Sequence, residues 1–204
     1  MSPILSKNQV KLLKLLGKEK LITDNFYLSG GTALAEYHLG HRLSEDLDFF
    51  SETEFDPQSV ATVLKKIQSD AGVKQVRHEQ SFNRNLYFLT LVDDEIKTEF
   101  TYFPFPRIER GKRINGIEID SLLDIAVNKI FTIYQKPRSR DFIDLYFILK
   151  KEAWTISDLV KNAQIKFDNY IDPIQLGAQF IKAEELKDYP RMIEPLDHAE
   201  WRRF

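Results

Sequence analysis

The sequence contains no cysteine among its 204 residues. Disulfides, cysteine nucleophiles and thiolate metal sites are therefore excluded. It also contains no run of about 18 apolar residues, so no segment is expected to span a membrane. The first turns of the chain lack the unbroken apolar core of a signal peptide, because lysines interrupt the leucines. We therefore expect a cytoplasmic protein.

A strong excess of charge is also absent, since 29 Lys and Arg stand against 31 Asp and Glu and give a formal net charge of −2. Overall charge therefore does not indicate nucleic-acid binding. Internal repeats and low-complexity segments are missing as well. What is present is a globular composition with 43% hydrophobic and 12% aromatic residues. A chain of this length can bury a substantial core.

Helices and strands are mixed in the first part of the chain. Helices are predicted over residues 6–19, 32–40 and 56–72, the last bounded by Asp56, Pro57 and Gly72. Strands are predicted over residues 46–50, 73–80, 85–92 and 95–103. Asp93-Asp94 and Asn115-Gly116 predict hairpin turns. From Ser121 onward the pattern is helical, over residues 121–134, 141–151 and at least two more segments. The sequence thus predicts an α+β fold, with one part over residues 1–120 and a helical part over 121–204 packed on it.

Two aspartates, Asp46 and Asp48, stand one residue apart in the strand "DLDFF". On a strand they project from the same face, while Leu47 and Phe49 face the core. Neighbouring carboxylates repel each other, and partial burial increases the cost. A Mg²⁺ ion removes this cost because it prefers oxygen ligands. For an isolated Asp-x-Asp, however, the ordinary explanation is a solvated edge strand.

Two further features favour a site for a metal and a triphosphate. Gly30, Gly31 and Thr32 stand where the short helix begins, and a helix N-terminus offers N–H groups and a favourable dipole to phosphate. A tight turn from strand to helix also requires glycine. Glu99 shares a strand face with Lys97, and it can act as a third carboxylate if its strand lies beside that of the aspartates. Three carboxylates can hold two metal ions. Alone, Glu99 is more typical of a surface residue.

Together these segments resemble the AbiEii/AbiGii toxin family of nucleotidyltransferases, in the superfamily of DNA polymerase beta. The resemblance rests on G-G-T-x-L, a short helix and H-R-x-S-x-D-x-D-F-F, and it covers roughly residues 25–150. A downstream lysine, Lys129, and the R-D-x-x-D-L segment of Arg140, Asp141 and Asp144 belong to it. The resemblance implies a nucleotidyltransferase-like mixed β-sheet flanked by helices, followed by a helical C-terminal region. Where the superfamily often has an aspartate as third carboxylate, this chain has Glu99.

The resemblance also implies a function. A toxin with a cognate antitoxin would transfer a nucleotide from an NTP to RNA, particularly tRNA, with Mg²⁺ and two ions at the site. The implied metal ligands are Asp46, Asp48 and Glu99. Lys129 and Asp141 complete the catalytic set. The implied substrate-binding residues are Gly30, Gly31, Thr32, Arg42, Ser44, Arg140 and Asp144.

Several of these residues also have a structural explanation. Arg42 and Ser44 fit a solvent-facing loop, Lys129 can extend to solvent from its helix, and Asp141 can cap the helix that begins there. Asp141 and Asp144 lie on nearly the same helical face, so they can act together. His41 is interpreted as a surface residue and is not assigned to the catalytic set.

Seven basic residues are candidates for RNA contacts, although charge runs are usually solvated faces. They are Arg107, Arg110, Lys112, Arg113, Lys136, Arg138 and Arg140. Contacts of this kind would make binding strongly salt-dependent. Three other functions are open: a nucleotidyltransferase that modifies a protein or small molecule, a non-catalytic binding protein of the same fold, and a phosphatase. Phe49 and Phe50 after the aspartates disfavour the phosphatase, which normally has Thr or Val there.

Overall fold

A mixed β-sheet forms the centre of the molecule, for which a computed structural model describes residues 4–201 and 204. Seven strands lie in the order β3-β4-β5-β2-β1-β7-β6. They are β1 (Tyr27–Ser29), β2 (Leu47–Ser51), β3 (Gln75–Ser81), β4 (Arg84–Thr90), β5 (Glu95–Tyr102), β6 (Arg113–Ile114) and β7 (Ile117–Ile119). β2 runs parallel to β5 and β1 to β7, while the other neighbours are antiparallel. The predicted α+β fold with a mixed sheet is confirmed.

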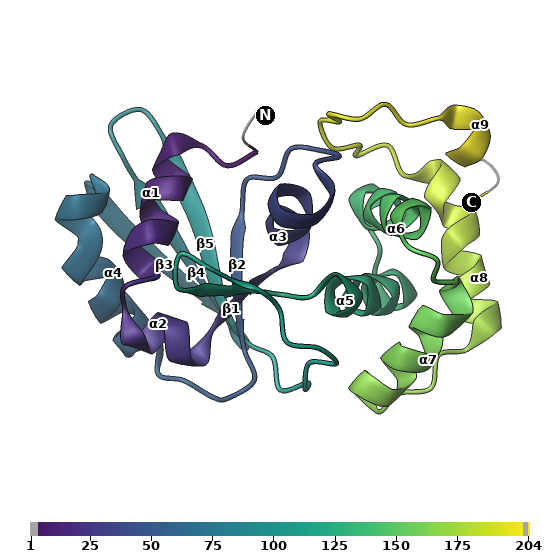
Figure 1. The fold of residues 1–204 in the computed structure, drawn as a ribbon, viewed down its shortest axis with the longest axis horizontal. Helices are drawn as coiled ribbons and strands as arrows, with labels where there is room; N and C mark the ends of the chain where they lie inside the picture. Colours follow the sequence, from purple (N-terminus) through teal and green to yellow (C-terminus); the bar gives the residue numbers. More distant parts are fainter. Residues whose placement is uncertain (1–3, 202–203) are drawn as a thin grey trace.

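Helices cover both faces of this sheet. In the first part of the chain they are α1 (Lys7–Leu16), α2 (Lys20–Asn25), α3 (Gly30–Leu34), the π-helical segment η1 (Ala35–Leu39) and α4 (Pro57–Ala71). In the second part they are α5 (Leu122–Gln135), α6 (Ser139–Lys151), α7 (Ile156–Phe167), α8 (Pro173–Lys182), the 3₁₀ segment η2 (Ala183–Glu185) and α9 (His198–Trp201). Helices α1, α2 and α4 lie on one side, and α3 and α5 lie on the other (Figure 1). Helices α6, α7 and α8 each pack against α5. Among residues 4–201 and 204, no helix is long and apolar enough to cross a membrane.

The local signals of the sequence explain most helix ends. Asp56 caps α4 by accepting a hydrogen bond from Gln58 N, and Gly72 closes the helix with φ 81°. Gly40 ends η1 in the same left-handed conformation, with φ 74°. The helix predicted over 6–19 ends earlier, at Leu16, and the separate α2 follows it. At Gly17, which follows α1 directly, the backbone of Asn115 packs so closely that no side chain would fit.

Both predicted hairpins are confirmed. β4 and β5 pair through Thr90 opposite Glu95, so the turn between them contains Asp93 and Asp94. β6 and β7 pair through Ile114 opposite Ile117. Asn115 and Gly116 between them both have positive φ, 49° and 87°, as a tight two-residue turn requires.

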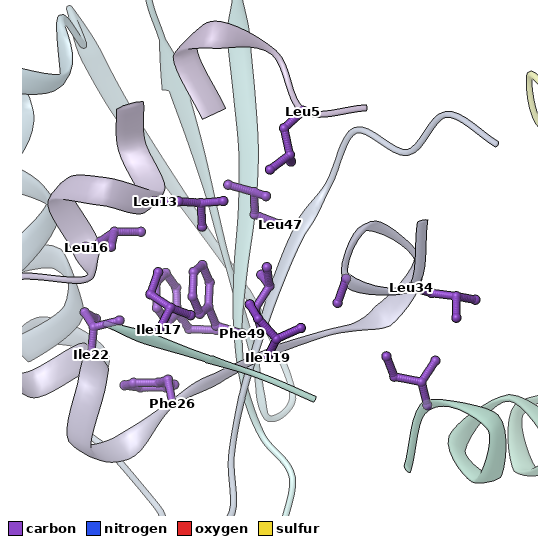
Figure 2. Packing of buried hydrophobic residues seen from close by; sticks show 14 of the residues in the cluster. Leu5, Leu13, Leu16, Ile22, Phe26, Leu34, Leu47, Phe49, Ile117 and Ile119 are labelled. Atoms are coloured by element: carbon purple, nitrogen blue, oxygen red, sulfur yellow. The ribbon is translucent and has the colours of Figure 1, made fainter. Parts of the chain in front are cut away.

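The apolar core fixes the orientation of β2. Leu47 and Phe49 are fully buried, and the ring of Phe49 stacks on Phe100 with centroids 4.9 Å apart. Figure 2 shows Leu47 and Phe49 in a cluster with Leu13 and Leu16 of α1. Full burial of such a side chain contributes about 1.5–3 kcal/mol. Because strand residues alternate, Asp48 and Phe50 must point to the opposite face.

The C-terminal residues return to the first part of the chain. Arg42 and Met192 form a β-bridge, and Leu43 N donates to Arg191 O at 2.8 Å. Ile193 N and Glu194 N both donate to His41 O. The main apolar cluster also includes residues from both sides of residue 120. The division into parts 1–120 and 121–204 therefore stays a prediction.

Candidate active site

The three carboxylates lie on the face of the sheet opposite α1. β2 and β5 are neighbours, and their parallel register places Asp48 directly opposite Glu99. Asp46 precedes β2 by one residue and lines the same cleft, which has a volume of about 880 Å³. The assignment of Glu99 required its strand to lie beside that of the aspartates, and the two strands are neighbours.

The pKa of Asp48 is strongly perturbed. Its side chain keeps a partly exposed surface in the cleft, yet the surrounding protein removes enough water to raise its pKa to about 6. The negative charges of Glu99 and Asp46 raise the pKa further. At neutral pH the ionised carboxyl is therefore held at a cost, which a nearby cation would relieve.

Two basic side chains form ion pairs with the other two carboxylates, those of Asp46 and Glu99. Lys97 Nζ lies 2.9 Å from Asp46 Oδ2. Arg84 donates from Nε and Nη2 to the two oxygens of Glu99, at 2.7 and 2.5 Å. Thr101 Oγ1 also donates to Glu99, at 2.6 Å. Arg84 and Lys97 were not predicted as site residues, although Lys97 stands two positions before Glu99 on the same strand face.

The carboxylates fit a divalent cation by their chemistry. Oxygen ligands on neighbouring strands are those that Mg²⁺ binds, with waters completing the shell. In the described ranges 4–201 and 204, however, no three His, Asp or Glu side chains converge as a ready metal site. Asp46 and Glu99 would have to exchange Lys97 and Arg84 for the ion.

The glycine turn packs tightly against these groups. Gly30 has φ 73°, and a Cβ there would lie 2.5 Å from Asp48 Oδ2. A Cβ on Gly31 would collide with the guanidinium of Arg42. Both glycines line the cleft. They therefore permit a close approach of protein side chains, and the predicted contact with phosphate stays a prediction.

Thr32 and Ser44 form hydrogen bonds next to the residue that precedes β2. Thr32 is fully buried, and its Oγ1 donates to Asp46 O at 2.5 Å. The same atom lies 2.8 Å from Ser44 Oγ. Ser44 lines the cleft, whereas Thr32 does not. Thr32 thus ties the start of α3 to the residue that precedes β2.

A buried charge network centres on Asp144 of α6. Its Oδ1 accepts from Arg42 Nε at 2.6 Å and lies 2.8 Å from His41 Nε2, while its Oδ2 accepts from Arg42 Nη2 at 2.9 Å. Lys129 Nζ lies 2.7 Å from Asp144 Oδ2 and 2.7 Å from Asp141 Oδ1. His41, expected at the surface, is instead completely buried. Its burial follows from the pairing of its backbone with residues 193 and 194.

The network sets the ionisation of its members. Burial alone would raise the pKa of Asp144, but Lys129, Arg42 and His41 hold it well below its usual range. Burial alone would lower the pKa of Lys129, but Asp144 and Asp141 outweigh it and raise that pKa. Both residues are therefore charged at neutral pH. Lys129 remains at the wall of the cleft with its position fixed by two carboxylates.

Asp141 has two partners at once. Its Oδ2 accepts from Arg138 N at 3.0 Å, which caps α6, while Oδ1 binds Lys129. Arg138 and Arg140 line the cleft beside it. Asp141 therefore both caps α6 and holds Lys129 at the cleft.

Ten of the twelve predicted site residues line the cleft, and the other two, Thr32 and Asp144, contact residues that do. The C-terminal segment adds Asp188, Pro190 and Arg191 to the lining. Ser139 Oγ donates to Asp188 O at 2.6 Å, and Arg191 forms an ion pair with Glu45. Sequence patterns gave no signal for this segment.

Six of the seven predicted basic residues are divided between two cavities, and Lys112 lines neither. Lys136, Arg138 and Arg140 line the cleft that holds the carboxylates. Arg107, Arg110 and Arg113 line a second cavity of about 460 Å³. Arg107 is paired there with Glu52 and Glu118, at 3.0 and 2.6 Å. The seven basic residues therefore do not form a single surface along one cleft.

Two solved structures from Helicobacter pylori share this fold. JHP933 is 20% identical, with a TM-score of 0.55, over 89% of this chain and 94% of that one. A candidate nucleotidyltransferase is also 20% identical, with a TM-score of 0.59, over 97% of this chain and 91% of that one. This chain thus shares its fold with a candidate nucleotidyltransferase.

Sequence comparison gives the family. The model of the nucleotidyl transferase AbiEii toxin of type IV toxin–antitoxin systems matches residues 14–204. The uncharacterized protein aq_aa25 of Aquifex aeolicus (strain VF5) is 36% identical over 152 residues, 72% of this chain and 69% of that protein. The chain belongs to the AbiEii nucleotidyl transferase toxin family, and it is an enzyme of the nucleotidyltransferase class.

Proposed function

We propose that this enzyme transfers a nucleotide from an NTP to tRNA with the help of Mg²⁺, as the toxin of a toxin–antitoxin system. The observation that carries the proposal is the strand register that places Asp48 opposite Glu99 with Asp46 beside them. These carboxylates share a cleft with Lys129 and Arg140. A cleft with carboxylates on one wall and basic groups on the other suits a metal-bound triphosphate.

Asp46, Asp48 and Glu99 would hold the metal. When bound, Mg²⁺ supplies charge neutralisation at the phosphates and favours an attacking oxyanion. Lys129 and Arg140 bring positive charge to the triphosphate from the other side of the cleft. The acceptor hydroxyl attacks the α-phosphorus in line and loses its proton to solvent, a new P–O bond forms, and pyrophosphate leaves as its bond to the α-phosphorus breaks. Catalysis is then mainly positioning and charge stabilisation.

The acceptor is inferred from the charge at the cleft. Lys136, Arg138, Arg140 and Arg191 all line it, and basic side chains of this kind bind the phosphates of RNA. The toxin role and the cognate antitoxin are inferred from the family description. NTPs and tRNA are both present in the cytoplasm, where we expect the enzyme to act.

Incubation of the purified protein with total tRNA, Mg²⁺ and each α-labelled NTP in turn tests the acceptor. We expect label on tRNA from one preferred NTP, and less label as salt is raised. Parallel reactions contain a protein extract or a small-molecule extract in place of tRNA. Label on protein or on a small molecule, with none on tRNA, would contradict the tRNA assignment and favour the other acceptor. Absence of transfer to any acceptor would favour a binding protein of the same fold.

A further inference from the structure

Two phenylalanine rings form an aromatic surface inside the cleft. Phe50 and Phe103 both line it, and both are partly exposed. Their ring centroids are 4.9 Å apart, with an angle of 31° between the planes. Tyr27 braces Phe50 edge-on at 6.0 Å, and Phe105 braces Phe103 at 5.0 Å. Most other side chains that line the cleft are charged or polar, so this aromatic pair requires an explanation.

The position of Phe50 relative to the carboxylates is set by β2. Phe50 stands two residues after Asp48, so the two side chains project from the same face roughly 7 Å apart. On β1, Ser29 lies opposite Asp48 and Tyr27 lies opposite Phe50. The turn at Gly30 is therefore on one side of Asp48, and Phe50 is on the other.

Helix α5 forms the opposite wall. Lys129, Thr132 and Gln135 line the cleft from this helix, and Lys136 lines it directly after the helix end. The ring of Phe167 contacts both Phe103, at 6.1 Å, and Phe131 of α5, at 3.9 Å, so the aromatic pair lies next to this helix. Within the described part of the chain the exposed amide of Gln135 has no hydrogen-bond partner.

We propose that Phe50 and Phe103 are the platform on which the nucleobase of the NTP stacks. The inference rests on the proposed function, because it takes the phosphates to lie at Asp48 and Lys129. A nucleotide held there has its triphosphate among charged groups, and its base must leave the α-phosphorus in another direction. Phe50 is one strand repeat away, a span that a ribose can bridge. The two tilted rings offer an exposed aromatic face on which a base can stack, which the carboxylates and basic groups do not.

Stacking of this kind contributes affinity without selecting one base, because every base has a π-face. A choice among NTPs then requires a polar group at the base edge. Gln135 lines the same cleft, and its amide can both donate and accept a hydrogen bond. In this proposal the two rings supply affinity, and Gln135 on the opposite wall supplies selection among bases.

The test is a calorimetric titration of the full chain with NTPs and with inorganic tripolyphosphate, both in Mg²⁺. The variants are Phe50→Leu and Phe103→Leu, which keep an apolar side chain but lose the ring. We expect either substitution to weaken NTP binding about tenfold, in line with measured base stacking, and to leave tripolyphosphate binding within about twofold. Phe55→Leu is the matched control, because Phe55 is a partly buried ring that packs on Phe26 and does not line the cleft. It should leave both affinities unchanged.

Each other outcome has a distinct meaning. NTP affinity unchanged in both variants would overturn the inference. If a parallel titration with tRNA then shows weaker binding in the same variants, the platform belongs to a base of the acceptor. Equal loss of NTP and tripolyphosphate binding would overturn the inference as well, because the rings would then act on the phosphate site. If the wild-type protein binds no NTP in Mg²⁺, the proposed function fails together with the inference.

Discussion

At the scale of single residues, two buried aspartates near the start of α5 have opposite electrostatics. Asp120 accepts hydrogen bonds from Ser29 Oγ at 2.6 Å and from Ser121 N at 3.1 Å, yet burial and the nearby Asp124 raise its pKa to about 7. Asp124 pairs with Lys166 at 2.6 Å. Burial alone would raise the pKa of Asp124, but Lys166 and two backbone N–H groups hold it below its usual value.

The Asp120→Asn variant should change the pH dependence of stability. The folded protein keeps the Asp120 proton up to about pH 7, whereas the unfolded chain releases it near its ordinary value of 3.8. Wild-type stability should therefore fall as pH rises from about 4 to about 7, and the asparagine should remove this fall. At about pH 8 we expect the variant to be more stable by about 1–4 kcal/mol. Urea unfolding at several pH values measures it.

Asp124→Asn is the control for this prediction, because it breaks a buried ion pair and should destabilise the protein above about pH 4. A wild-type stability that is flat across this range, together with a less stable Asp120→Asn variant at high pH, would contradict the account of Asp120.

Lys97 is expected to compete with a metal for Asp46. The two groups are 2.9 Å apart and both about one-third exposed. In Lys97→Met the three carboxylates lose one neutralising charge, so Mg²⁺ should bind several-fold more tightly and raise the melting temperature more than in wild type. Thermal melts over a Mg²⁺ titration measure this effect.

Lys150→Met is the matched control, since Lys150 also pairs with one carboxylate, that of Glu200, and does not line the cleft. It should leave the response to Mg²⁺ unchanged. A smaller response in Lys97→Met than in wild type would show that Asp46 does not face the ion.

At the scale of elements, the turn from β1 into α3 positions Asp48. Gly30→Ala should cost about 1–3 kcal/mol, because φ is 73° there and the added Cβ would meet Asp48. The displaced carboxyl should also reduce nucleotide transfer. Denaturant unfolding and a transfer assay measure the two effects.

Gly177→Ala is the control, because Gly177 lies inside α8 with no atom near the added Cβ. This variant should be more stable than wild type by about 0.5–1 kcal/mol. Equal stability of both variants would contradict this reading.

The junction between α6 and the loop after η1 depends on Asp144. Asp144→Asn leaves Arg42 and Lys129 buried with one fewer negative charge, and it should cost about 3–5 kcal/mol. Chemical denaturation measures the loss. Glu200→Gln, which breaks an exposed pair, should have little effect. A loss in Asp144→Asn no larger than that of Glu200→Gln would refute a structural role for the network.

Elements with local signals could be predicted from the sequence. Asp56, Pro57 and Gly72 define α4, and Asn115-Gly116 defines the β6–β7 turn. The close packing of Asn115 against Gly17, directly after α1, could not be predicted, because Asn115 is distant in sequence. The π-helical form of η1 could not be predicted either, because its wider turn left no pattern in the apolar positions.

At the scale of the whole molecule, long-range pairing completes the site. The spacing of Asp46 and Asp48 predicted two carboxylates on one face, and the register of β2 with β5 adds Glu99. Three further features depend on contacts that are not local in the sequence. They are the ion pair of Arg84 with Glu99, the burial of His41, and the pairing of residues 191–194 with the loop at His41. Such contacts between side chains and segments that are not adjacent in the sequence have no local sequence signature.

The most direct test of the central claim is nucleotide transfer by three proteins side by side, with α-labelled NTP and total tRNA, in Mg²⁺ or in EDTA. The proteins are wild type, Asp48→Asn and Asp120→Asn, a second buried aspartate that does not line the cleft. We predict that Asp48→Asn lowers the rate by at least about 100-fold, that EDTA abolishes transfer, and that Asp120→Asn keeps the wild-type rate. Transfer at the wild-type rate by Asp48→Asn, or transfer that persists in EDTA, would contradict the assignment of the three carboxylates as the metal-binding centre of this enzyme.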